Sequence, residues 1–213
     1  MRPLFLALVL TVAPLTAGPG YRALAQATPV AEAESREPDV VFVPTPQAVV
    51  EKMLEMAEVK KGDVVYDLGC GDGRIVVTAA KKYGVKAYGF DIDPKRVAES
   101  LANVKSNKVE HLVTIKQADI FKLDLREASV VTLYLLPELN VRLMPQLEKL
   151  KPGSRIVSHD FAMRGAKPVE VHRMRVPNNS APATDSDYGS GREHTIYKWV
   201  VPWEKETTAA LGN

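Results

Sequence analysis

The part of this sequence best suited to chemistry is a glycine-rich loop that begins with a carboxylate. It occupies residues 67–74, between the apolar residues 64–66 and the helical pattern of residues 75–80. Glycine tolerates positive φ and has no Cβ, so a ligand can lie directly against this backbone. Open α/β sheets bind ligands at such strand-to-helix edges. The loop therefore predicts a nucleoside-cofactor site, formed by Asp67, Gly69, Gly71, Asp72 and Gly73.

The spacing of the glycines favours S-adenosylmethionine over a dinucleotide. Dinucleotide sites use G-x-G-x-x-G, with a pyrophosphate at the N-terminus of the helix. Here the pattern is D-x-G-x-G-x-G. Its leading carboxylate repels a pyrophosphate but attracts the ammonium of S-adenosylmethionine, which carries no phosphate. An NAD-dependent oxidoreductase is the rival hypothesis that this spacing opposes.

Two further acids end the next two predicted strands. Asp91 is placed to hold two ribose hydroxyls, and Asp119 ends a strand where an adenine amino group could be met. Ile92 and Ile120 follow these acids and are expected to line the same cofactor site. Asp119 could equally be a helix cap. Cys70 is better explained as a small buried side chain than as a nucleophile.

The sequence around the loop alternates between strand and helix patterns. Strands are expected at residues 64–66, 85–90, 113–118, 130–134 and 155–160, with helices between them. Thr45 is expected to cap the first helix, and Pro145 to interrupt or restart the helix that begins near Glu138. Residues 169–174 and 195–200 are expected to pair antiparallel and close the sheet, with a mobile loop over 177–193.

Residues 43–203 resemble class I S-adenosylmethionine-dependent methyltransferases. Within that superfamily, the glycine loop and residues 43–46 and 130–137 are similar to the membrane-associated lysine N-methyltransferases that modify the c-ring protein of ATP synthase and the adenine nucleotide carrier. The resemblance implies a seven-stranded Rossmann-like α/β sheet with helices on both faces. It also implies methyl transfer from S-adenosylmethionine to a protein lysine. This chain has Asp91 where those enzymes usually carry glutamate, which keeps a ribose contact plausible.

The methyl acceptor is expected at the carboxyl ends of the fourth and fifth strands. Tyr134 and Asp160 are the candidate catalytic residues, and Thr45, Pro137 and His159 are placed on the acceptor side. Ordinary core or strand-end roles for these side chains remain open. Transfer of a sulfonium methyl needs no metal, and near-attack positioning can supply roughly 7–11 kcal/mol. We therefore expect no metal site. A small-molecule or quinone methyltransferase and a non-catalytic S-adenosylmethionine-binding module are the alternatives.

Composition agrees with one catalytic domain. The chain has 213 residues, of which 46% are hydrophobic, enough for one core. Its formal net charge of +2 is too small to indicate a nucleic-acid partner. The Asn-Pro-Pro-Tyr type of motif is absent, which also argues against chemistry on nucleic-acid bases. The expected partner is a protein lysine or a small acceptor, and the sequence does not indicate an oligomeric state.

The N-terminus resembles a secretory signal peptide. Arg2 precedes an apolar run over residues 4–13, and Ala23-Leu24-Ala25 has the small residues of a cleavage site before Gln26. We expect a signal peptide over residues 1–25, a flexible linker over 26–38, the methyltransferase domain over 39–205 and a tail over 206–213. The mature protein would be periplasmic or extracellular. An uncleaved signal that anchors it in the membrane is the alternative, and either would bring it near a membrane.

Overall fold

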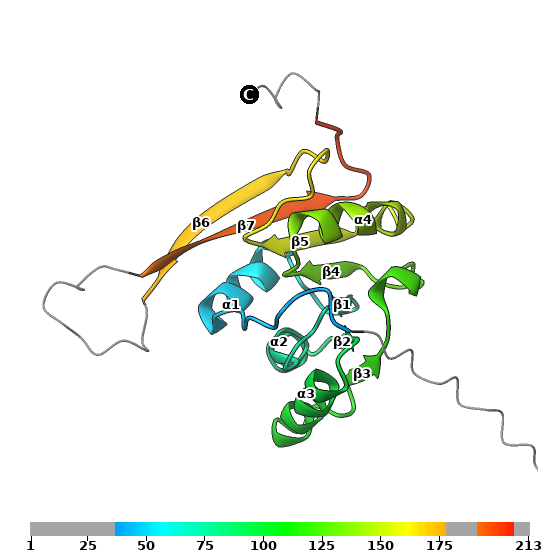
Figure 1. Cartoon of the computed structure of the whole chain (residues 1–213), viewed down its shortest axis with the longest axis vertical. Helices are drawn as coiled ribbons and strands as arrows, with labels where there is room; N and C mark the ends of the chain where they lie inside the picture. The colour runs from blue at the N-terminus through cyan, green and yellow to red at the C-terminus, as the bar shows by residue number, and fades with distance from the viewer. Residues whose placement is uncertain (1–36, 178–190, 207–213) are drawn as a thin grey trace, which may run out of the picture. The chain divides into compact units, whose positions relative to one another are not determined.

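Strands and helices alternate along the chain in the computed structural model, which describes residues 37–177 and 191–206 (Figure 1). The strands are β1 (Val64–Leu68), β2 (Lys86–Asp91), β3 (Val113–Gln117), β4 (Val130–Leu133), β5 (Arg155–His159), β6 (Glu170–Val176) and β7 (Arg192–Val200). The helices are α1 (Gln47–Met56), α2 (Arg74–Tyr83), α3 (Pro94–Ser106) and α4 (Pro137–Leu147), with a short 3₁₀ helix, η1 (Ile120–Lys122).

The strands form one seven-stranded sheet in the order β3-β2-β1-β4-β5-β7-β6. The five strands from β3 to β5 in that order are parallel. Strand β7 lies antiparallel between β5 and β6. The predicted sheet and its antiparallel closing pair are both confirmed. The chain reverses strand order on the two sides of β1, and open sheets bind ligands at such a point.

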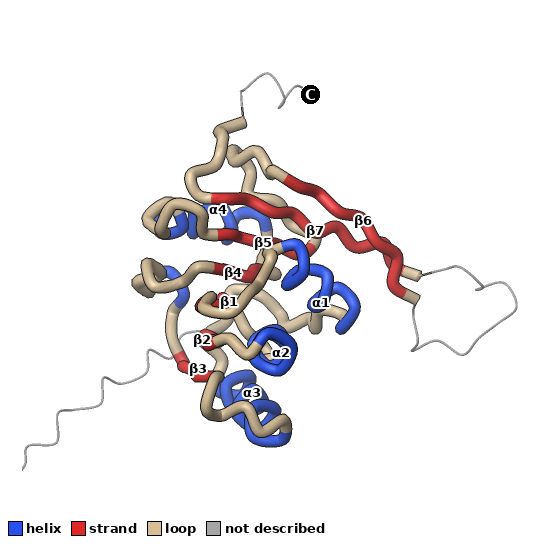
Figure 2. The backbone as a smooth tube through the Cα atoms, turned by 180° about the vertical axis from the view of Figure 1, so that it is seen from behind, coloured by secondary structure: helices blue, strands red, loops and turns tan. Residues whose placement is uncertain are grey.

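Helices cover both faces of the sheet, as the resemblance implied. Neighbouring side chains on a strand point to opposite faces, so Val65 and Val130 pack with α1 and α2, whereas Tyr66 and Val131 pack with α4. Figures 1 and 2 show α1, α2 and α3 on one side of the strands and α4 on the other. The two hydrophobic layers hold the strand ends in fixed positions, and these ends carry the predicted site residues.

The prediction that Thr45 caps the first helix is wrong. Helix α1 begins at Gln47, its N-cap is Pro46, and no side chain caps it. The hydroxyl of Thr45 instead lies 3.1 Å from Nδ1 of His159, which is fully buried and needs a polar partner. A long-range contact therefore takes the hydroxyl that a local cap would have used.

The prediction that Pro145 interrupts its helix is also wrong. Helix α4 runs through Pro145 and ends at Leu147. A proline removes the hydrogen bond to the carbonyl four residues earlier, and here that loss falls in the last turn. Leu143 and Leu147 lie four residues apart on the same helix face and are both fully buried. Their packing holds this last turn.

Several expectations concern residues outside the described part of the chain. The signal peptide and all but the end of the linker lie there, as do most of the loop over 177–193 and most of the tail. Within residues 37–177 and 191–206, none of the helices combines the length and the apolar character needed to cross a membrane.

Candidate functional site

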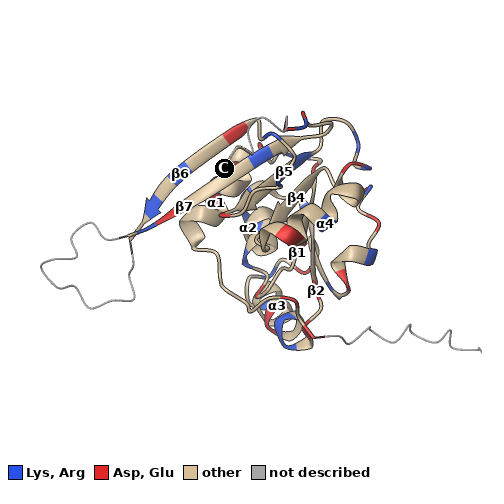
Figure 3. Cartoon of the chain, turned by 45° about the horizontal axis from the view of Figure 1, so that its top comes forward, with Lys and Arg blue, Asp and Glu red and all other residues tan. Residues whose placement is uncertain are grey.

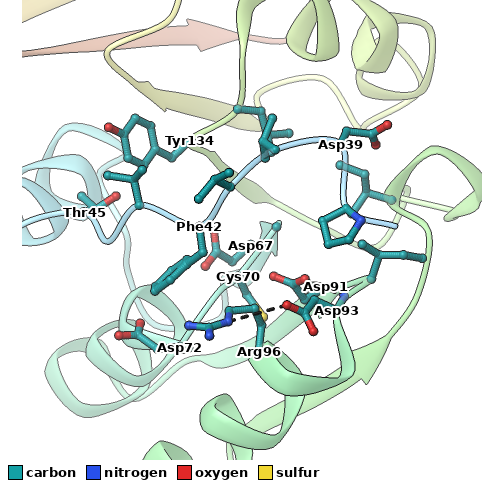
Figure 4. Close-up of a pocket in the computed structure, with 18 of the residues that line it drawn as sticks. Asp39, Phe42, Thr45, Asp67, Cys70, Asp72, Asp91, Asp93, Arg96 and Tyr134 are labelled. Atoms are coloured by element: carbon teal, nitrogen blue, oxygen red, sulfur yellow. Dashed lines mark hydrogen bonds and ion pairs between the residues drawn. The ribbon is translucent and has the colours of Figure 1, made fainter. Parts of the chain in front are cut away.

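A pocket lies at the carboxyl ends of the parallel strands and is covered by the segment that precedes α1. Its lining comes from residues 38–45, the glycine loop, and the ends of β2, β3 and β4. It holds about 930 Å³ of space, including the open solvent at its mouth. Figure 4 shows Thr45 and Tyr134 at one end and Asp91 and Asp93 at the other, with Asp67 between them. The predicted cofactor and acceptor residues therefore share one cavity.

The three loop glycines are required by backbone geometry. Gly69, Gly71 and Gly73 have φ values of 82°, 55° and 75°, in the left-handed region that glycine adopts without strain. A Cβ on Gly71 would lie 2.0 Å from a ring carbon of Phe42, and one on Gly73 would lie 2.9 Å from the hydroxyl of Ser100. Each glycine thus allows the loop to pass close under its neighbours.

Asp91 ends β2 and supports the loop from beneath. Its Oδ2 accepts a hydrogen bond from the Gly71 amide at 2.8 Å, and its Oδ1 accepts one from the Asp93 amide at 3.0 Å. Burial raises the pKa of this carboxyl, although the backbone donors oppose the shift. Asp91 lines the pocket, and each oxygen of a carboxylate can accept a second hydrogen bond. The ribose contact stays a prediction, and the geometry leaves room for it.

Asp67 lies in the middle of the pocket wall and is 2% exposed. The hydroxyl of Thr132 donates to its Oδ1 at 2.6 Å. Burial raises the pKa of Asp67 to about 7, against that hydrogen bond, and the nearby carboxylates of Asp91 and Asp72 raise it further. A buried acid in this state gains most from a cationic ligand, which would favour its ionised form.

The basic side chains at the pocket are already occupied. Among the described residues, Arg74 and Arg96 are the basic residues in the lining. Arg74 binds Asp72, with Nε 2.9 Å from Oδ1, and Arg96 lies 3.8 Å from Asp93. This pocket is consequently poor for a pyrophosphate. Its carboxylates and glycine backbone fit S-adenosylmethionine, which carries an ammonium and a sulfonium.

The third predicted acid has a local partner. Oδ1 of Asp119 accepts a hydrogen bond from the Phe121 amide at 3.0 Å and so caps η1, as the alternative interpretation expected. Its neighbours Ala118 and Ile120 line the pocket, and Ile92 lines it from the end of β2, as predicted. The contact of Asp119 with an adenine amino group stays a prediction.

The acceptor-side residues divide into two layers. Thr45 and Tyr134 line the pocket, whereas His159 is fully buried behind them. The ring of Tyr134 lies 3.9 Å from that of His159, centre to centre, at an interplanar angle of 37°. Burial raises the pKa of Tyr134, and Asp160 adds to the shift while Arg192 opposes it. Pro137 is the first residue of α4 and is not part of the lining.

Cys70 behaves as the sequence predicted. It is 5% exposed, and its Sγ lies 3.6 Å from the hydroxyl of Ser100. Burial raises the pKa of its thiol well above the ordinary value, so the thiol stays protonated. A protonated thiol is a weak nucleophile.

Sequence reasoning missed three residues of the site. Phe42 lies against Gly71, and the guanidinium of Arg96 lies 4.7 Å from the centre of its ring. His194, on β7, lies 2.8 Å from His159. Nothing local in the sequence marks Phe42. The predicted pairing of residues 155–160 with 195–200 could have pointed to His194, because it places the start of one strand beside the end of the other.

Comparisons with known proteins agree with this geometry. Residues 67–170 match the family model described as ANTKMT methyltransferase domain. A protein-lysine N-methyltransferase of Saccharolobus islandicus is 46% identical over 166 residues, which cover 77% of this chain and 95% of that protein. The human lysine N-methyltransferase of the ATP synthase c-ring protein is 30% identical over 138 residues, which cover 64% of this chain and 58% of that protein.

A solved structure carries the cofactor product. The crystal structure of an RNA methyltransferase from Salinibacter ruber in complex with S-adenosyl-L-homocysteine superimposes with a TM-score of 0.65 at 42% identity, covering 76% of this chain and 95% of that one. These similarities decide between the methyltransferase and dinucleotide hypotheses. The cofactor is S-adenosylmethionine, and the chain belongs to the family of S-adenosylmethionine-dependent methyltransferases that contains the Saccharolobus islandicus enzyme.

Proposed function

We propose that this enzyme methylates the side-chain amine of a lysine in a protein. The observation that carries the proposal is the end of the pocket formed by Thr45 and Tyr134, where a hydroxyl and an aromatic ring lie together away from Asp91. An aromatic face attracts an alkylammonium group, and a hydroxyl can accept its hydrogen bond. The similarity to protein-lysine N-methyltransferases supports the same acceptor.

Bound S-adenosylmethionine supplies a methyl group that its sulfonium already activates. The task left to the chain is to position a neutral amine in line with that methyl, and positioning can lower the barrier by roughly 7–11 kcal/mol. For a lysine with a pKa of about 10.4, being neutral at pH 7 costs about 4.6 kcal/mol. The half-buried wall around Tyr134 lowers this cost, because burial disfavours the charged amine.

RNA is the acceptor that the Salinibacter ruber protein's description names, and the charge distribution of this chain argues against it. Figure 3 shows basic and acidic side chains interspersed over the helices and strands. Binding to a phosphate backbone draws its affinity from several clustered cations. The two arginines at the pocket are paired with carboxylates. RNA is therefore retained as an outcome of the test.

The test is to incubate the purified protein with isotope-labelled S-adenosylmethionine and a cell-envelope extract. The envelope is the first extract to use, because the apolar run of the N-terminus predicts that the enzyme acts near a membrane. Protein, RNA and small-molecule fractions are then separated, and mass spectrometry locates the label. We expect label on protein lysines. Label confined to RNA or to small molecules would overturn the lysine proposal, and binding without any transfer would indicate a non-catalytic module.

Tyr134→Phe is the matched variant for this experiment. The ring remains in contact with His159, but the hydroxyl at the acceptor end of the pocket is lost. We expect lower turnover with nearly unchanged affinity for S-adenosylmethionine, because the change acts on the acceptor side. An equal loss of cofactor affinity would place Tyr134 at the cofactor instead.

A further inference from the structure

A chain of hydrogen bonds leads from the acceptor end of the pocket to the surface. Thr45 lines the pocket, and its hydroxyl lies 3.1 Å from Nδ1 of His159. Nε2 of the same ring lies 2.8 Å from Nδ1 of His194. Asp160 lies 3.4 Å from His159 and 3.7 Å from His194, and it pairs with Arg192, whose side chain is 60% exposed.

We propose that Thr45, His159 and His194 form a proton relay that removes the proton of the acceptor amine from the pocket. This inference rests on the proposed amine acceptor and identifies what the second layer of the site does. Methylation of an ammonium releases one proton, and the pocket is closed on this side by buried residues. The three polar groups provide a continuous route for that proton.

The geometry of the two imidazoles favours a hydrogen bond over a shared metal ion, although His159, Asp160 and His194 are close enough together to be considered as ligands. The two ring centres are 4.9 Å apart and the two nitrogens 2.8 Å apart. The two nitrogens are thus much closer than the ring centres and lie at hydrogen-bond distance. A metal would need both lone pairs to converge on one point beside this line. The carboxylate that could join them, Asp160, has its Oδ2 2.7 Å from Arg192.

The proton balance is simple. One N–H bond of the substrate ammonium breaks and its proton passes to Oγ1 of Thr45, while the hydroxyl proton of Thr45 passes to Nδ1 of His159. The proton on Nε2 of His159 passes to Nδ1 of His194. The electron pair left on the amine forms the new N–C bond, and the pair of the broken S–C bond stays on sulfur. One proton remains on His194, beside the carboxylate of Asp160.

The surroundings suit this division of roles. Burial lowers the pKa of His159 to about 4, although Asp160 opposes the shift, so the ring is neutral at pH 7 and passes a proton on without retaining it. The charged and titratable groups that face the pair are Asp160 after β5, Arg192 on β7 and Tyr134 after β4. The amide of Thr195 donates to Oδ1 of Asp160 at 3.0 Å and fixes this carboxylate.

His194→Asn is the sharpest variant. An asparagine oxygen at this place still accepts the hydrogen bond from His159 but cannot accept the proton. Single-turnover methyl transfer to a lysine peptide should fall at least tenfold at pH 7, given that general acid–base catalysis contributes roughly 10²–10⁴. The variant's rate should climb about tenfold per pH unit between roughly pH 7 and 9, as free neutral amine becomes available. The wild-type rate should climb less steeply, and cofactor affinity should be unchanged.

Thr45→Val and Thr45→Ser form a matched pair at the entrance of the relay. Valine removes the hydroxyl and should reproduce the steep pH profile, whereas serine should restore the shallower wild-type slope. A His194→Asn profile parallel to that of the wild type would overturn the relay, because a merely structural role lowers the rate without steepening its pH dependence. So would one bound metal ion per chain, measured by elemental analysis, that disappears in His194→Asn. Wild-type protein that methylates no amine would refute the proposed function itself, and the Thr45 pair keeps the relay testable if His194→Asn fails to fold.

Discussion

Asp67 combines deep burial with a place in the cofactor pocket, and this makes binding of S-adenosylmethionine sensitive to pH. The pKa of its carboxyl is raised to about 7, mainly by burial. The cationic cofactor favours the ionised form, so its affinity should rise with pH between roughly 5.5 and 7. Above this range the α-amino group of the cofactor loses its own proton, at roughly 7.7–8.0. Calorimetric titration at several pH values measures the slope.

Asp67→Asn is the control for this prediction. The amide keeps the shape and the hydrogen bond from Thr132 but cannot ionise, so binding should be weaker and nearly independent of pH. The sign for folding is opposite. Because the folded pKa lies above the unfolded value of about 3.9, the wild type loses stability as pH rises from roughly 4 to 7. The variant should lack this loss, and identical pH profiles for the two proteins would contradict the role of Asp67.

Asp91 is expected to hold the ribose hydroxyls in addition to the loop. Removing a hydrogen bond to a charged group costs roughly 1.5–3 kcal/mol, so Asp91→Ala should weaken S-adenosylmethionine binding by roughly 10- to 100-fold. Asp91→Glu should lose less, because it keeps the carboxylate. Thermal unfolding of both variants checks that the loop, which donates through Gly71, stays folded. An unchanged affinity in Asp91→Ala would remove this residue from the cofactor site.

At the scale of elements, the segment before α1 and the glycine loop depend on each other. Phe42 fills the space above Gly71, and Arg96 of α3 lies on its ring. Gly71→Ala places a Cβ against that ring at a position with positive φ. We expect it to abolish detectable binding of S-adenosylmethionine while the sheet remains folded, as followed by calorimetry and circular dichroism.

A double variant separates the clash from the backbone strain. Phe42→Ala opens space for the new Cβ, so adding Gly71→Ala to Phe42→Ala should cost less affinity than Gly71→Ala costs in the wild type. Equal costs in the two backgrounds would mean that Phe42 does not press on the loop. The segment before α1 would then be only a neighbour of the pocket.

At the scale of the whole molecule, we propose that the protein is exported. The basic residue, apolar run and small residues of the first 25 positions motivate the proposal. Full-length protein produced in a Gram-negative host should be recovered outside the cytoplasm, with its chain beginning at or near Gln26. Cell fractionation followed by N-terminal sequencing checks both points. Soluble cytoplasmic protein that begins at Met1 would refute export.

Much of the fold and of the cofactor site follows from the sequence, because its signals are local. The order of strands and helices is written in apolar periodicity. The conformation of the loop is written in three glycines, all of which have positive φ. Asp67 and Asp91 are marked by their places at strand ends, and parallel strands bring such ends to one edge of the sheet. The sequence by itself thus determined the fold class, the cofactor and the edge where it binds.

The tertiary structure decided what the second layer of the site contains. Thr45 and His159 are 114 positions apart, and His159 and His194 are 35 apart. They meet because β7 pairs with β5 and because α1 packs on the same two strands. Spacing along the chain carries no trace of such contacts. A hydroxyl that looks like a helix cap therefore became the partner of a buried histidine, since an unpaired polar group in the core costs more free energy than a missing cap at the surface.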